Sequence, residues 1–174
     1  LYHPVLYPRV SIIDPELMVT VPPHLTAATG FDVFTHSFES TLHPGCGPYT
    51  AILAKEAIHI VAEYLPTAVR NGRNLEARSA MAWADTMAGL CIANAGVTLP
   101  HGMAMAIGGM YPKVMHGEAL AIVYPSTMRF SYSRALQQFA DMGRIFDSNL
   151  QRVTVRQAAA KSCLAVDRFL KKIG

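Results

Sequence analysis

An aspartate and a histidine stand four residues apart in the apolar, helix-forming stretch "GFDVFTHSFES" at residues 30–40. Residues at positions i and i+4 share one face of a helix, with their Cβ atoms within about 6 Å. Asp32 and His36 can therefore close on a single metal ion. A carboxylate that is buried without a partner costs several kcal/mol. The stretch predicts either a face that meets water or a cation held against Asp32.

Two further histidines, His101 and His116, each stand at a predicted helix start. Each is followed by glycine, which lets neighbouring backbone approach closely. In one continuous helix, the 15 positions between them would separate them by about 22 Å at the usual rise. We therefore expect the chain to reverse near residues 108–112, where glycines and a proline occur, and to fold the two segments side by side.

Three imidazoles and one carboxylate, with no cysteine among them, suit Fe(II) or Zn(II) better than Cu(I) or calcium. Four protein ligands still leave a coordination position for a substrate oxygen, which indicates Lewis-acid chemistry. The alternative is that these histidines are structural, and composition and spacing alone leave both interpretations open. We expect the remaining histidines to be ordinary surface or hydrogen-bonded residues: His3, His24, His43 and His59.

The composition limits the classes of protein that fit. The 174 residues are 51% hydrophobic and 16% charged, which predicts a globular chain with one core and some apolar surface covered by another domain or subunit. The net charge of +3 with scattered Lys and Arg disfavours nucleic-acid binding, and no apolar run reaches the roughly 18 residues of a membrane span. Three cysteines without a CxxC motif favour a reducing compartment, so we expect a cytoplasmic protein.

The expected fold is mainly α, with a short β-like leader at residues 1–23 and an all-helical region at residues 24–174. In the leader, β-branched residues at 10–13 predict a strand, and Asp14-Pro15 predicts a turn. Hydrophobic periodicity and breakers then predict helices from Thr29, as its cap, to about residue 42 and over later segments. Those later segments are 49–65, 74–96, two within 100–125, 132–145 and 154–173.

Three ordered motifs, "TAATGFDVFTHSFES", "GLCIANAGVTLPHGMAMAIGG" and "HGEALAIVYPSTMRF", resemble those of the iron-containing (group III) alcohol dehydrogenases. The resemblance covers essentially the whole chain. It implies the fold that this family shares with dehydroquinate synthase, in which a nucleotide-binding α/β domain precedes an all-helical metal domain. It also implies that the ion is bound by Asp32, His36, His101 and His116.

By this resemblance the protein catalyses the reversible NAD(P)-dependent oxidation of an alcohol to an aldehyde or ketone with Fe(2+) or Zn(2+). Family chains are about twice as long. We therefore expect residues 1–23 to end a missing nucleotide-binding domain that holds most of the NAD or NADP, and the last helices to be truncated. Alone, this part would bind metal without turning over NAD. A homo-oligomer is also expected. The alternatives are a zinc-dependent polyol dehydrogenase, a dehydroquinate synthase-like enzyme or a non-catalytic helical metal-binding module.

The chain departs from the family pattern at Met105, where the "HGMAH" motif has a second histidine that is near the nicotinamide or moves a proton. The interval from His101 to His116 is also one residue longer than is usual, and no glycine-rich pyrophosphate motif is present. The sequence therefore assigns no catalytic or cofactor-binding residue. Among supporting residues, Glu39 is a candidate to orient His36, and Phe34 and Ile92 are candidates to line an alcohol pocket or fill the core.

Overall fold

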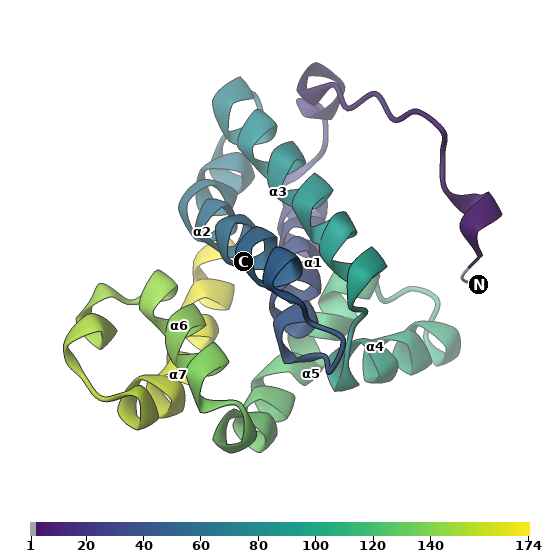
Figure 1. Ribbon diagram of the computed structural model, residues 1–174. Coiled ribbons are helices and arrows are strands. Elements are labelled where there is room, and N and C mark those ends of the chain that lie inside the picture. The colour runs from purple at the N-terminus through teal and green to yellow at the C-terminus, as the bar shows by residue number, and fades with distance from the viewer. Residues whose placement is uncertain (1–2) are drawn as a thin grey trace.

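Helices make up the structure, a computed structural model that describes residues 3–174 (Figure 1). Seven α-helices and four short 3-10 helices occur in this described part. In chain order they are η1 (Pro4–Leu6), η2 (Pro15–Met18), α1 (Pro23–Leu42), α2 (Pro48–Arg70), α3 (Leu75–Asn94), α4 (Leu99–Met110), α5 (His116–Ser131), η3 (Tyr132–Arg134), α6 (Leu136–Phe146), η4 (Ser148–Arg152) and α7 (Val155–Ile173). The helical fold class expected from the sequence is confirmed.

Helix α1 is the central element, because it contacts α2, α3 and α5 and lies between them in Figure 1. One of its faces carries Phe31, Phe34 and Phe38, spaced by three and four residues, and all three rings are buried. Phe31 meets Tyr124 of α5 edge-on with ring centroids 5.4 Å apart, and Phe38 meets Phe139 of α6 at 5.0 Å. Such aromatic pairs add about 0.5–1.5 kcal/mol to the burial itself. This face anchors α1 in the core.

Several helix ends follow the expected local signals. Asn74 caps α3 by accepting a hydrogen bond from the Ala77 N–H at 2.9 Å, and Thr154 forms a capping box at the start of α7. The predicted start of α1 at Thr29 was wrong. The helix begins at Pro23, where a proline in the first turn is tolerated, and the Thr29 hydroxyl donates to the Leu25 carbonyl inside the helix.

The strand expected at residues 10–13 does not form. Between η1 and η2 the backbone extends away from the helices (Figure 1), and Val10 and Ile12 are 78% and 91% exposed. A strand is stable only where a neighbouring strand completes its backbone hydrogen bonds, and the described residues contain no other strand. The predicted turn at Asp14 instead starts η2, because its side chain accepts from the Glu16 N–H at 2.9 Å.

Arg78 of α3 holds the start of α1 in place, although it is itself buried. Its guanidinium donates to the Thr26 hydroxyl, the Val21 carbonyl and the Gly72 carbonyl at 2.8–2.9 Å. These three acceptors belong to α1, the segment before it and the α2–α3 turn. The fork-shaped donor set of arginine suits such a junction. This role could not be predicted from local sequence patterns, because it depends on groups 52 and 57 residues away.

The chain reverses between α4 and α5, as expected, and the two helices pack against each other. The first turn of α5 lies directly on α1: Gly117 faces the backbone of Ala28 so closely that any Cβ would clash with the Ala28 carbonyl. Glycine is required here by close approach rather than by an unusual backbone angle. This contact sets the position of His116, the residue before it, relative to α1.

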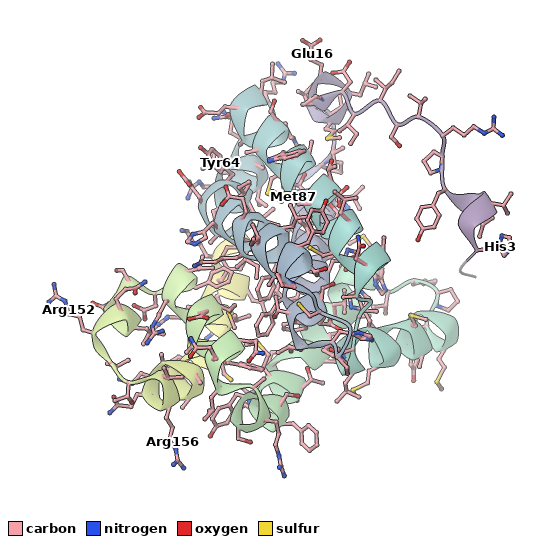
Figure 2. All side chains as sticks on the ribbon, viewed as in Figure 1. His3, Glu16, Tyr64, Met87, Arg152 and Arg156 are labelled. Atoms are coloured by element: carbon pink, nitrogen blue, oxygen red, sulfur yellow. The ribbon has the colours of Figure 1, made fainter. Side chains whose placement is uncertain are left out.

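Met87 of α3 points into the core, whereas Arg152 and Arg156 project outward near α7 (Figure 2). Helix α4 contains no Asp, Glu, Lys or Arg and exposes Met103, Met105 and other apolar side chains. No single helix in residues 3–174 has the length and hydropathy to cross a membrane; α3 and α4 pass that test only as a pair, bent by 101°.

Replacing Gly117 with alanine is expected to destabilise the protein by about 1–3 kcal/mol, the usual cost of overpacking, because backbone must move to admit the Cβ. The matched control is Gly108→Ala in α4, where a Cβ meets nothing within 4 Å in the described structure. That change should be neutral or stabilising by up to about 1 kcal/mol. Urea unfolding of the three proteins measures both effects, and equal stabilities for Gly117→Ala and Gly108→Ala would contradict this packing.

Candidate metal centre

Three helices bring the four expected ligands together. Asp32 and His36 lie one turn apart on α1, His101 is the third residue of α4, and His116 is the first residue of α5. The face of α1 that carries Asp32 and His36 is not the aromatic face, so the helix is anchored on one side and offers the site on another. The reversal between α4 and α5 removes the separation that a continuous helix would impose on His101 and His116.

The side chains converge on one oxygen atom. Asp32 Oδ1 lies 3.4 Å from Nε2 of His36, 3.3 Å from Nε2 of His101 and 3.9 Å from Nε2 of His116. The donor atoms of Asp32, His101 and His116 all lie within 4.8 Å of one another. The rings of His36 and His101 stack with centroids 4.8 Å apart, and those of His101 and His116 are 5.2 Å apart.

This arrangement fits a shared cation. Donors about 2.0–2.2 Å from a tetrahedral ion lie roughly 3.3–3.6 Å apart, which matches the Asp32 distances to His36 and His101. His101 Nε2 is buried and makes no well-formed hydrogen bond among residues 3–174, although it lies 3.3 Å from Asp32 Oδ1. A buried polar atom without a partner costs about 1–3 kcal/mol. A metal ion between these atoms would supply the missing partner.

The pKa values show that the site attracts positive charge. Burial lowers the pKa of His101, but Asp32 and Glu39 outweigh it and raise that pKa to about 9. For Asp32, burial raises the pKa, but the surrounding imidazoles outweigh it and lower the pKa below its usual range. Burial lowers the pKa of His36, against the effect of Asp32, which favours the neutral imidazole that a metal needs. In the absence of a metal, His101 therefore holds a proton where a cation would bind.

Glu39 holds His101, not His36 as expected from the sequence. Its carboxylate is fully buried; Oε1 lies 2.8 Å from His101 Nδ1, and Oε2 accepts from the backbone N–H and the hydroxyl of Thr98 at 2.7 and 3.0 Å. The position of Glu39, seven residues after Asp32, puts it on the same face of α1. The pattern within α1 could not identify its partner, because His101 arrives from another helix.

Two cavities border the cluster. The first, of about 630 Å³, reaches His36 and His101 and is otherwise mainly apolar; α3 and the loop after it contribute Gly89, Ile92, Ala93, Gly96 and Val97. The second, of about 450 Å³, reaches Asp32 and His36 and also includes Asp85, whose pKa is raised by burial. The centre is therefore accessible from two sides, and one side suits a hydrocarbon chain.

The other sequence candidates divide between cavity, core and surface. Ile92 lines the larger cavity, whereas Phe34 is completely buried in the aromatic core and lines neither cavity that borders the cluster. Met105, one turn after His101 on α4, is 64% exposed. Sequence reasoning did not identify Asp85 or Thr98. Asp85 is four residues before Gly89 on α3, and only the tertiary packing of α3 against α1 brings it near His36.

Comparison with known proteins identifies the family of this chain. Residues 26–174 match the model of the Fe-containing alcohol dehydrogenase family, C-terminal. The chain is 37% identical over 167 residues to the NAD-dependent methanol dehydrogenase of Bacillus methanolicus and 38% identical over 167 residues to the 1,3-propanediol dehydrogenase of Klebsiella pneumoniae. Both alignments cover 96% of this chain but only 44% and 43% of those proteins. The chain thus spans less than half the length of these relatives.

Solved structures show the same fold. An alcohol dehydrogenase from an archaeal source in a Red Sea brine pool superposes with a TM-score of 0.89 at 37% identity, over 95% of this chain and 42% of that one. The crystal structure of a 1,3-propanediol oxidoreductase gives a TM-score of 0.89 at 37% identity, over 92% and 42% of the two chains. Fold, motifs and sequence identity agree: this chain belongs to the iron-containing alcohol dehydrogenase family and corresponds to its C-terminal part.

Proposed function

We propose that Asp32, His36, His101 and His116 are the protein ligands of one divalent metal ion, Fe(2+) or Zn(2+). The observation that carries the proposal is the convergence of three imidazole Nε2 atoms on Asp32 Oδ1 within 3.9 Å. Imidazole and carboxylate donors suit either ion. The charge of the site supports the proposal as well, because two carboxylates raise the pKa of His101 to about 9 despite its burial.

We further propose that this chain is the metal domain of an NAD(P)-dependent alcohol dehydrogenase. Family membership supports this function, and so do relatives named as NAD-dependent methanol dehydrogenase and 1,3-propanediol dehydrogenase. Most of the nucleotide would be held by a domain preceding residue 24, with residues 24–174 forming the metal domain. A cytoplasmic location and a homo-oligomeric state stay predictions.

Each group has a distinct part in this reaction. The metal would act as a Lewis acid that polarises the oxygen of the alcohol or of the carbonyl product. Asp32 supplies the negative charge that holds the cation, and the histidines fix its place among three helices. The larger cavity, lined by Ile92 and Val97 beside His36 and His101, is suited to bind the hydrocarbon part of the alcohol and to exclude water from it.

Metal content tests the proposed ligands. The chain purified without oxygen should bind one equivalent of Fe(2+) or Zn(2+), and Asp32→Ala and His101→Ala should each lose it, because each removes a donor from a four-ligand site. His59→Ala, a change at an exposed histidine of α2, is the matched control and should keep the ion. Elemental analysis after gel filtration measures the content. Retention of metal by both ligand variants would contradict the assignment.

Metal binding should release a proton from His101, whose pKa is about 9 in the metal-free protein. Zinc affinity should therefore rise by about tenfold for each pH unit between 7 and 9 and then level off, because the displaced proton is already lost above that pKa. Titration against a competing chelator of known pH dependence measures this slope. An affinity that is independent of pH between 7 and 9 would contradict a protonated His101.

The same pKa predicts the stability of the metal-free protein. Folded His101 has a higher pKa than the ordinary value of 6.5, so between pH 6.5 and 9 the native state holds a proton that the unfolded chain has lost. The contribution of His101 to the free energy of unfolding is therefore complete below about pH 6.5 and disappears as the pH rises through about 9. Unfolding curves of the wild type and His101→Ala, compared across this range, isolate that contribution.

Met105→His tests the departure from the family motif. The variant is made in the complete enzyme, which includes the domain that holds the nucleotide. Met105 is exposed and one turn from His101, so the new imidazole should leave metal content unchanged. It should add an ionisation near the ordinary histidine pKa to the pH dependence of kcat, since an imidazole can move a proton and a thioether cannot. Identical pH profiles for the two enzymes would show that this position takes no part in proton transfer.

A further inference from the structure

The buried carboxylate of Glu39 links two groups of α4 that lie one turn apart. One oxygen faces His101 Nδ1 at 2.8 Å, and the other accepts two hydrogen bonds from Thr98, at 2.7 Å from its N–H and 3.0 Å from its hydroxyl. Charge-assisted hydrogen bonds of this kind are roughly twice as strong as neutral ones. The carboxylate thus makes three contacts at one helix terminus, with its own side chain 0% exposed.

These contacts lie at the N-terminus of α4. Thr98 is the N-cap of this helix, and its own side chain makes no capping hydrogen bond. Free N–H groups and the helix dipole favour a negative charge at this end. Glu39 of α1 supplies that charge from outside the helix, so it fixes where α4 begins relative to α1. This in turn fixes the place of His101, the third residue of α4.

The contact with Glu39 also determines which nitrogen of His101 faces the site. With Nδ1 directed at Glu39, the ring presents Nε2, which lies 3.3 Å from Asp32 Oδ1 and has no hydrogen-bond partner among residues 3–174. The hydrogen bond made by one ring nitrogen commonly sets the metal-binding role of the other. In the described part of the chain, His101 pairs with a carboxylate outside the proposed ligand set, that of Glu39. The ion pairs of His36 and His116 are with Asp32, which is itself a proposed ligand.

We propose that Glu39 is a positioning residue. One oxygen of its carboxylate binds Thr98 and the other binds His101, so Glu39 holds the start of α4 against α1 and directs His101 Nε2 toward the metal site. This inference rests on the proposed metal site. It assigns Glu39 no contact with the ion or the substrate. Removal of the carboxylate should therefore weaken metal binding through the His101 ring, with every ligand still present.

Glu39→Gln is the sharpest variant, because it keeps the volume but replaces one acceptor oxygen with an NH₂ group. That group must face either the N–H of His101 or the two donors of Thr98. Cobalt(II) affinity of the full chain, followed by its visible absorption, should fall by about 10–100-fold, the usual effect of losing a group that orients a metal ligand. Thr98→Val removes the hydroxyl but keeps the backbone N–H, so its effect should be smaller.

The matched control is Ser37→Ala, which removes another buried polar atom of α1. The Ser37 hydroxyl donates to the Val33 carbonyl of the same helix at 2.8 Å rather than to one of the four proposed ligands. Its loss should leave cobalt affinity unchanged. Circular dichroism and thermal unfolding of the metal-free proteins separate a change at the site from a general loss of structure. Equal cobalt affinities for the wild type and Glu39→Gln would overturn the inference and leave the proposed metal site intact.

A second measurement needs no variant, so it decides the question even if Glu39→Gln fails to fold. In the zinc-loaded wild type, nitrogen-15 NMR should show that His101 carries its proton on Nδ1 and binds the ion through Nε2. A proton on Nε2 would overturn the inference. If the wild type binds neither cobalt nor zinc, the proposed function itself fails, and that outcome is distinct from a site that binds metal without any need for Glu39.

Discussion

The structure depends on how two buried or half-buried carboxylates of α1 are compensated. Asp32 is surrounded by three imidazoles, and Glu39 by His101 and the two donors of Thr98. An isolated buried carboxylate would cost several kcal/mol, a large share of the roughly 5–15 kcal/mol by which a domain is stable. Each carboxylate is stabilised by groups at the start of α4 or α5. The contacts that place these helices against α1 are therefore also the contacts that compensate the charge of the site.

One face of α1 holds the fold together, and another face carries the proposed metal site. The phenylalanine face joins α1 to α5 and α6 through ring contacts with Tyr124 and Phe139, and it would hold the helix in place without any ion. The accessible polar centre lies on the other face of α1, where α4 and α5 begin. Gly117 permits the close approach of α5 to α1, and Glu39 receives the start of α4. A rigid core thus positions ligands from three separate helices, which is what a preorganised site requires.

Much of this could be read from the sequence, and the reasons for the failures are physical. Helical periodicity, breakers and the family motifs identified most of the helices, Asp32 and the three histidines that converge on it, because these signals are local or are carried by the motif. The strand at residues 10–13 was wrong because pairing decides a strand and local propensity does not. The partner of Glu39 was misassigned and the role of Arg78 was missed, since both depend on groups more than 50 residues away. Tertiary contacts between helices leave no trace in local spacing.

The central claim is that three imidazoles and one carboxylate hold a single ion. X-ray absorption at the zinc edge of the zinc-loaded chain tests it most directly, because the spectrum counts ligands by type. The account predicts nitrogen and oxygen ligands at about 2.0–2.1 Å, with outer-shell scattering from three imidazole rings. Sulfur at about 2.3 Å, or scattering from fewer than three imidazoles, would contradict it by showing that the ion lies elsewhere or that one of the three histidines does not bind.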